Sequence, residues 1–81
     1  MNNDQETQYV LQSVCQAVGR RISELRQKKG LTQAHLAARS NLAVGELAKI
    51  EHGEGDFTVL RLLAIAEQLR TTVHELLKGI A

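Results

Sequence analysis

The chain contains no proline and no tryptophan, and it has only one cysteine, one tyrosine and one phenylalanine among its 81 residues. With a single cysteine no disulfide can form within the chain, and so few aromatic rings argue against base stacking on single-stranded nucleic acid. The longest apolar run, residues 62–66, is far too short to span a membrane, and the first thirty residues lack the apolar stretch of a secretory signal. We therefore expect a soluble, cytoplasmic protein with no membrane partner.

Catalytic and metal-binding patterns are also missing. The histidines His35, His52 and His74 fall on different predicted helices, and none has a cysteine or carboxylate at the spacing of a metal ligand set. Neither a glycine-rich phosphate loop nor a pair of acids suited to acid–base chemistry is evident. The sequence therefore predicts no enzyme, no metal, no cofactor and no small-molecule ligand.

Apolar residues recur at helical spacing almost throughout, which, with the absence of proline, predicts an all-α domain of about five helices. We expect an extended first helix over residues 7–29, ended by Gly30. A second helix is expected over residues 33–39, with Thr32 as its capping residue.

The stretch from Gly30 to Gly53 is typical of a helix-turn-helix, in which two short helices cross at a tight turn. Its second helix is expected over residues 43–52. Across the turn, apolar residues of the two helices would face each other, Leu36 and Ala37 against Leu47 and Ile50. The second helix of such a unit usually enters the DNA major groove, so this segment is the first candidate for function.

Two further helices are expected after the capping residues Thr58 and Thr72. The first of them carries one apolar stripe at helical spacing, made of Val59, Leu62, Leu63, Ala66 and Leu69. Residues 18–81 thus form the predicted helix-turn-helix domain, and residues 1–17 form a helical extension. Apolar side chains on this extension would pack either on the last helix of the same chain or on a second copy, as a dimer contact made by Tyr9, Val10, Leu11 and Val14.

The formal net charge of +1 gives no overall sign of a polyanionic partner, but the charges are unevenly distributed. Both flanks are net acidic, whereas residues 19–49 carry Arg20, Arg21, Arg26, Lys28, Lys29, Arg39 and Lys49 against Glu24 and Glu46. Such a basic centre fits either a surface that contacts DNA phosphates or ordinary solvated helix faces.

A series of short motifs runs through the chain without a gap. They are Gly19-Arg20-Arg21-Ile22-x-x-Leu25-Arg26, Gly30-Leu31-Thr32-Gln33-x-x-Leu36-Ala37, Leu42, Leu47, Ile50-Glu51-x-Gly53, and Leu62-Leu63-x-Ile65-Ala66 with Leu69. This pattern, from about residue 18 to residue 77, resembles the lambda-repressor-like helix-turn-helix family, also called the XRE family. The resemblance implies a domain of five helices that binds double-stranded DNA, commonly as a homodimer.

The resemblance also implies roles for three residues. Arg26 and Glu51 occupy the places at which the family forms an internal ion pair between the first helix and the recognition helix. Gln33 opens the second helix, where the family's glutamine helps to hold the DNA backbone beside free N–H groups.

The recognition helix departs from the family pattern, because its first turn is Ala43-Val44-Gly45-Glu46 where family members usually have polar or basic side chains. Val44 can touch a thymine methyl group and Glu46 can accept from a cytosine amino group, but bidentate arginine or glutamine contacts are missing. The predicted DNA contacts are Gln33, Ala43, Val44, Gly45, Glu46, Lys49, Arg39 and Arg20.

Two functions remain open at this point. One is a dimeric transcriptional regulator that binds operator DNA through base contacts or through DNA shape. The other is a protein-interaction module on the same fold, which would present Val44, Gly45 and Glu46 to another protein and bind DNA weakly or not at all.

Overall fold

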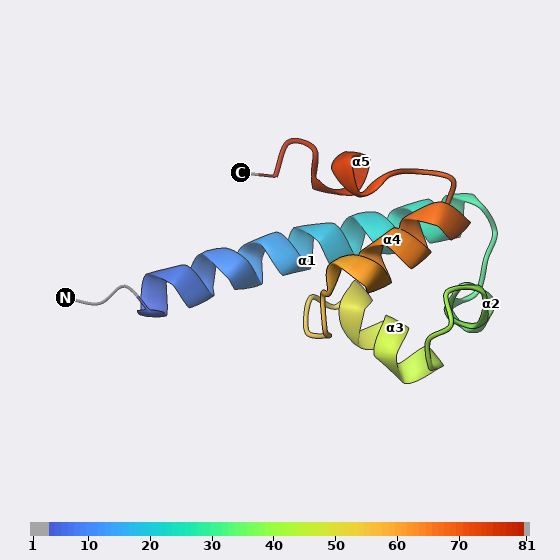
Figure 1. Cartoon of the computed structure of the whole chain (residues 1–81), viewed down its shortest axis with the longest axis horizontal. Coiled ribbons are helices and arrows are strands. Elements are labelled where there is room, and N and C mark those ends of the chain that lie inside the picture. The colour runs from blue at the N-terminus through green and yellow to red at the C-terminus, as the bar shows by residue number, and fades with distance from the viewer. Residues whose placement is uncertain (1–3, 81) are drawn as a thin grey trace.

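The computed structural model describes the backbone of residues 4–80 and the side chains of residues 11–80. This part of the chain consists of five α-helices and contains no strand: α1 (Asp4–Lys28), α2 (Gln33–Arg39), α3 (Val44–Glu51), α4 (Val59–Gln68) and α5 (Val73–Leu77). In Figure 1, α1 runs along the whole molecule, and the other helices gather beside its C-terminal part. The all-α class predicted from the sequence is confirmed.

Threonine side chains start three of the helices. The hydroxyl groups of Thr32, Thr58 and Thr72 accept the backbone N–H three residues later, at 3.0, 3.2 and 3.0 Å respectively. Each bond satisfies one of the N–H groups that the first turn of a helix leaves free. The predicted capping residues of α2, α4 and α5 are therefore confirmed.

The first four helices end in a residue with left-handed backbone, namely Gly30, Asn41, Gly53 and Arg70, with φ of 70°, 59°, 80° and 56°. After each of them, the next backbone N–H donates to the carbonyl five residues earlier, at 3.1, 2.8, 2.8 and 2.9 Å. This is the Schellman arrangement, which satisfies carbonyls at the end of a helix. The glycines signalled two of these ends in the sequence, whereas nothing in the local composition marked Arg70.

The core draws apolar side chains from every helix. Its buried members are Val18, Ile22, Leu36, Ala37, Leu47, Ile50, Leu62, Ile65, Ala66, Leu69 and Leu76. As predicted for the helix-turn-helix, the apolar residues of α2 and α3 meet across the turn within this core. α3 packs mainly against α1 and α2.

The predicted stripe on α4 is wrong in part. Val59 and Leu63 are 66% and 50% exposed, and Leu60 beside them is 78% exposed. Ile65 lies in the core instead, because positions 62, 65, 66 and 69 share one face of a helix with 3.6 residues per turn. The apolar surface of α4 is therefore wider than the face that the domain buries.

Glycines allow α1 and α3 to approach very closely. A Cβ atom placed on Gly19 would lie 2.8 Å from the carbonyl oxygen of Glu51, and one placed on Gly53 would lie 2.7 Å from the Cα atom of Gln16. Both distances are too short for a carbon atom, so a side chain at either position would push the helices apart. The C-terminal end of α3 is thereby held against the middle of α1.

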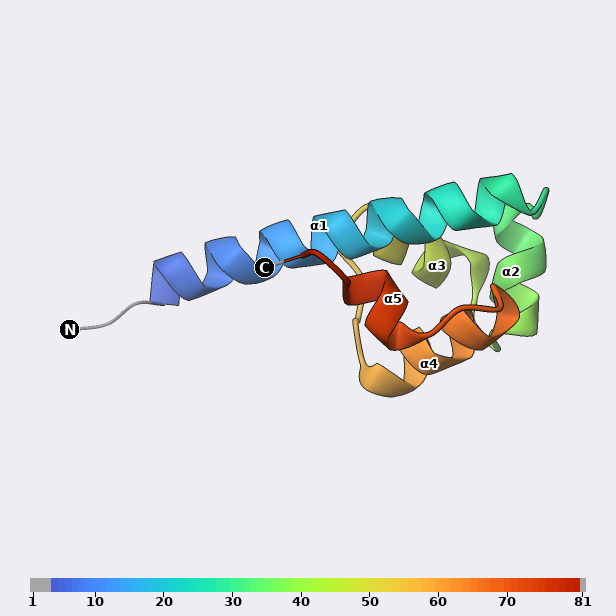
Figure 2. The same cartoon turned by 90° about the horizontal axis from the view of Figure 1, so that it is seen from above.

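The N-terminal part of α1 projects beyond the other helices (Figures 1 and 2). Of the residues predicted to form a dimer contact there, Leu11 is 57% exposed, and Val14 packs partly against the core of its own chain. The side chains of Tyr9 and Val10 lie outside the described residues. None of the helices in residues 4–80 has both the length and the apolar character that crossing a membrane requires.

Candidate nucleic-acid interface

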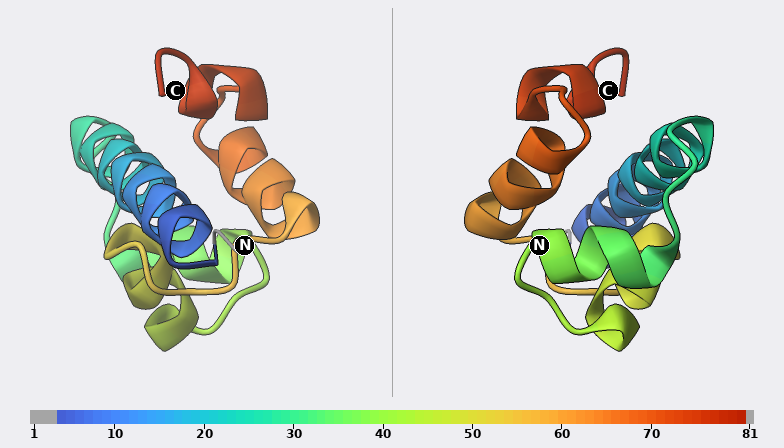
Figure 3. Two further views of the ribbon diagram at one scale, coloured as in Figure 1. Left: turned by 90° about the vertical axis from the view of Figure 1, so that its left-hand side faces the viewer. Right: turned by 90° about the vertical axis from the view of Figure 1, so that its right-hand side faces the viewer.

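α3 and α2 lie on the side of the molecule opposite α5 (Figure 3). Leu47 and Ile50 anchor α3 in the core, while Val44, Gly45 and Lys49 are exposed. Val44 is 50% exposed, and a Cβ atom placed on Gly45 would meet no other atom within 4 Å. Within a single chain, the outer face of the first turn of α3 is therefore open.

The first turn of α3 is stabilised by a carboxylate. Ala43 is the N-cap residue and has no side-chain acceptor, but Oε1 of Glu46 accepts its backbone N–H at 2.9 Å. Oε2 of Glu46 accepts from Nη2 of Arg61 on α4 at 2.7 Å. The Ala43 N–H first, and then Arg61, hold the pKa of the Glu46 carboxyl below its ordinary value. Glu46 is thus a stable anion, and both of its oxygens have partners inside the chain.

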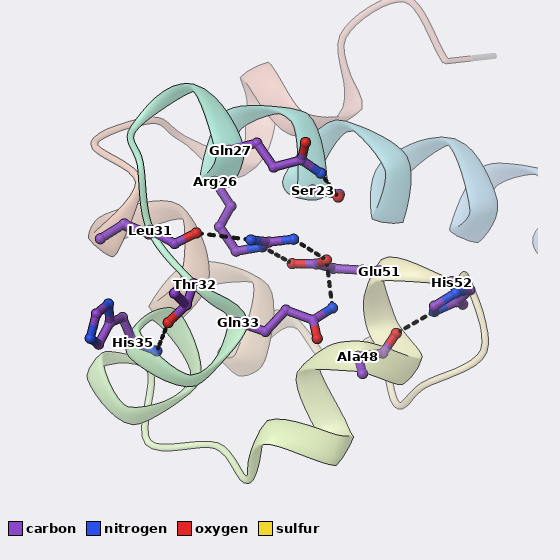
Figure 4. Close-up of polar contacts among 10 residues, drawn as sticks. All are labelled: Ser23, Arg26, Gln27, Leu31, Thr32, Gln33, His35, Ala48, Glu51 and His52. Carbon is purple, nitrogen blue, oxygen red and sulfur yellow. Dashed lines mark hydrogen bonds and ion pairs between the residues drawn. The ribbon is translucent and has the colours of Figure 1, made fainter.

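The structure brings Arg26 and Glu51 together (Figure 4). Nε and Nη2 of Arg26 donate to the two carboxylate oxygens of Glu51 at 2.7 and 3.1 Å. Nη1 of Arg26 donates to the carbonyl of Leu31 at 2.8 Å, and Nε2 of Gln33 donates to Glu51 at 2.9 Å. This network ties the end of α1, the start of α2 and the end of α3 to one another.

The network is shielded from water, since the side chains of Arg26 and Glu51 are 12% and 4% exposed. A bidentate pair in such surroundings fixes geometry more firmly than a surface pair. It also orients Gln33, whose amide is held by Glu51 at the point where α2 begins. The three residues assigned roles by the family resemblance therefore form one unit.

The basic residues of the central segment divide into two groups. Arg20, Arg39 and Lys49 are exposed on α1, α2 and α3 respectively. Arg21, by contrast, points to the C-terminal end of α5, where its Nη1 donates to the carbonyls of Glu75, Leu76 and Lys78 at 3.1, 3.1 and 2.7 Å. Arg21 thus stabilises the end of a helix, and its guanidinium is engaged on the side away from α3.

A polar cleft lies between α1 and the C-terminal end of α3. It is lined by Gln16, Arg20, Ser23, Glu51 and His52. The ring nitrogen Nδ1 of His52 donates to the carbonyl of Ala48 at 2.8 Å, which fixes the ring at the end of α3 (Figure 4). Of the residues that line this cleft, only Arg20 was predicted from the sequence to contact DNA. Gln16 and Ser23 share its face of α1, because they lie four residues before it and three residues after it.

Comparison with known proteins adds independent information. A family model described as Helix-turn-helix (HTH_3) matches residues 22–76. The HTH-type transcriptional regulator DdrOP3 of Deinococcus deserti is 33% identical over 60 residues, which are 74% of this chain and 46% of that protein. An uncharacterized HTH-type transcriptional regulator of Sinorhizobium fredii, y4dJ, is 37% identical over 59 residues, which are 73% of this chain and 77% of that protein. The chain therefore spans less than half the length of DdrOP3 but most of the length of y4dJ.

Two crystal structures of the clp gene regulator ClgR from Corynebacterium glutamicum have the same arrangement of helices. One superposes with a TM-score of 0.76 at 26% sequence identity, covering 79% of this chain and 68% of that chain. The other has a TM-score of 0.77 at 25% identity, covering 84% of this chain and 92% of that chain. The similarity thus extends over the domain that contains α2 and α3.

Proposed function

The chain belongs to the helix-turn-helix family HTH_3, and we propose that it is a DNA-binding transcriptional regulator, acting in the cytoplasm, that places α3 in the major groove as a homodimer. The regulators to which it is similar support the binding of DNA. The observation that carries the placement of α3 is its open outer face, which is anchored from behind by Leu47 and Ile50. A rigid and uncovered helix of this kind is what major-groove recognition requires.

The contacts that we propose divide by chemistry. The first turn of α3 offers an apolar surface, Ala43, Val44 and Gly45, that fits against thymine methyl groups and allows close approach of the DNA. The proposed contacts to phosphates are Gln33, Arg39, Lys49 and Arg20. Glu46 lies in the same turn with both oxygens engaged inside the chain, so sequence preference would depend more on DNA shape than on hydrogen bonds to bases.

We assign dimerisation to the projecting part of α1, with Tyr9, Val10, Leu11 and Val14 as the proposed contact. The exposure of Leu11, at 57%, supports this assignment, because a projecting helix gains stability when a second copy covers its apolar residues. A two-fold dimer would also present two copies of α3 to successive turns of the duplex.

One observation favours a second candidate function, the protein-interaction module. The exposed start of α3 is apolar at Val44 and Gly45, and the carboxylate of Glu46 is already satisfied. A surface with so few free hydrogen-bond donors also suits contact with a protein. DNA binding decides between the two functions.

The test is a fluorescence anisotropy titration of labelled random-sequence duplex and of sheared genomic DNA at about 50 mM salt, where non-specific dissociation constants should lie at or below the roughly 1 to 100 μM typical of physiological salt. Lys49→Gln is expected to weaken binding about three- to fivefold, because it removes a phosphate contact. Lys78→Gln serves as the matched control, since it removes the same charge from the end of α5 on the opposite side of the molecule. Absence of binding to either DNA would exclude the regulator and leave the interaction module.

A further inference from the structure

We propose that Arg61 is a positioning residue for the DNA-binding surface: it holds the first turn of α3 through Glu46 and neutralises the charge that Glu46 would otherwise present to phosphates. Arg61 lies on α4, outside the helix-turn-helix itself. The proposal rests on the proposed function, because it concerns the surface that α3 offers to DNA.

The first step of the argument is the missing cap of α3. Most helices begin at a side chain that accepts an N–H of the first turn, but Ala43 has none. Glu46 supplies the reciprocal half of a capping box, because its Oε1 accepts the N–H of Ala43 at 2.9 Å. The orientation of the Glu46 carboxylate therefore decides whether the chain enters α3 at the observed angle.

The second step is that Arg61 sets this orientation. Its Nη2 donates to Oε2 of Glu46 at 2.7 Å, so the two carboxylate oxygens are held by two different partners at once. The backbone of Arg61 is itself fixed, since its N–H donates to the capping hydroxyl of Thr58 at 3.2 Å. The main packing partners of α3 are α1 and α2, so this pair adds a link from α4 to the first turn of α3.

The third step concerns charge. Glu46, Lys49 and Arg61 line one shallow depression with Gly55 and with two acids of the following loop, Glu54 and Asp56. Acids outnumber cations there even with Arg61 present. Removal of Arg61 would leave the Glu46 carboxylate uncompensated beside the DNA, where phosphates would repel it. Without Arg61, the N–H of Ala43 still lowers the pKa of Glu46, and even an ordinary glutamate is ionised near neutral pH, so this carboxylate would stay charged.

The experiment is a double-mutant cycle on DNA affinity with the full chain, using Arg61→Gln, Glu46→Gln and both together. The probe is a labelled pool of random-sequence duplexes of about 30 base pairs, long enough for two half-sites one helical turn apart. At about 50 mM salt, Arg61→Gln is expected to weaken binding about three- to fivefold. The same substitution in the Glu46→Gln background is expected to change affinity by less than about twofold, because the amide has no charge to neutralise and its oxygen still accepts the Ala43 N–H.

Lys78→Gln controls for the loss of one positive charge and is expected to leave affinity unchanged within about twofold. Circular dichroism of each variant confirms that it is folded.

If Arg61→Gln binds as tightly as the wild type, the inference is wrong. If it costs the same in both backgrounds, Arg61 contacts DNA directly and does not act through Glu46, which also overturns the inference. Failure of the wild type itself to bind the pool overturns the proposed function and this inference with it, and is distinguished from the other outcomes by the wild-type titration alone.

Discussion

Single side chains decide how firmly the end of α3 is attached. Arg26 and Glu51 are both largely buried, and each of their charged atoms has a partner within the network that includes Leu31 and Gln33. Removing one member would leave the other charge buried without compensation, which costs much more than the loss of a surface ion pair. The pair therefore matters more to stability through the penalty for breaking it than through its own attraction.

Glu51→Ala is expected to lower the free energy of unfolding by about 3 kcal/mol, because Arg26 would lose its partner in a site with little access to water. Replacing both residues by apolar ones of similar volume, Arg26→Met with Glu51→Leu, is expected to cost less than the single change. Urea unfolding of the single and double variants measures both. Purely additive effects in a cycle of Arg26→Ala and Glu51→Ala would show that the two charges do not stabilise each other.

Glu46 makes stability depend on pH in a predictable direction. Its hydrogen bond from Ala43, and then its pair with Arg61, lower its pKa in the folded protein below that of the unfolded chain. The stabilisation is therefore fully present above the ordinary glutamate pKa of about 4.3 and is lost as the pH falls through the lower folded value. Wild type should unfold at a higher temperature than Glu46→Gln at pH 7, and the difference should vanish in strong acid. An equal difference at both pH values would contradict this role of the charge.

At the scale of the helices, the close crossing of α1 and α3 depends on the absence of a side chain at Gly19. Gly→Ala within a helix is normally stabilising by up to about 1 kcal/mol, because alanine restricts the unfolded chain. At Gly19, however, the new methyl group would meet the backbone of α3, which cannot move without disturbing Ile50 and Glu51. The sequence alone would predict that Gly19→Ala stabilises the protein, whereas the packing against α3 predicts that it destabilises the protein.

We expect Gly19→Ala to destabilise the protein by about 2 kcal/mol, the usual cost of an overpacked contact. Gly45→Ala is the matched control, since it lies in α3 with open space around its Cβ position and should be neutral or stabilising by about 0.5 kcal/mol. Thermal unfolding of the two variants gives the comparison. If Gly19→Ala leaves the melting temperature unchanged or raises it, as expected for Gly45→Ala, the crossing of α1 and α3 is looser than the structure shows.

Helix ends show which elements were predictable. The threonine caps and the glycine ends depend on hydrogen bonds between residues three to five positions apart, so a local pattern contains the whole interaction. The cap of α3 was missed because Ala43 gives no signal and Glu46 accepts its N–H from within the helix. The contact that stabilises the end of α5 was missed because Arg21, which makes it, is more than fifty residues away in the chain.

At the scale of the whole molecule, the exposed apolar side chains are the candidate surfaces for the proposed contact with a second copy. The described residues expose large apolar side chains on four helices: Leu11 on the projecting part of α1, Val44 on α3, Val59, Leu60 and Leu63 on α4, and Leu77 on α5. We propose the dimer contact on α1, because its N-terminal part projects beyond the other helices (Figure 2), and an isolated stretch of helix is only marginally stable by itself.

Leu11→Ser is therefore expected to shift the protein from dimer to monomer, by about tenfold or more in the dissociation constant, since it removes a large apolar side chain from the contact. Leu60→Ser removes a side chain that is even more exposed, at 78% against 57%, and should leave the association unchanged. Sedimentation equilibrium over a range of concentrations measures both. The opposite pattern would place the contact on α4, and a wild-type monomer at all concentrations would remove the proposed dimer.

The sequence by itself determined the helical class, the helix-turn-helix, the threonine caps and most of the residues that belong to the core, because these follow from spacing and from hydrogen bonds between near neighbours. Only the tertiary structure decided that Arg21 donates to the carbonyls at the end of α5, that Arg61 pairs with Glu46, and that Val59 and Leu63 face outward. The type of a basic or apolar residue in the sequence does not reveal in which direction its side chain points in the fold. Its partner is selected by how the helices pack, and that packing brings together residues fifteen and more positions apart.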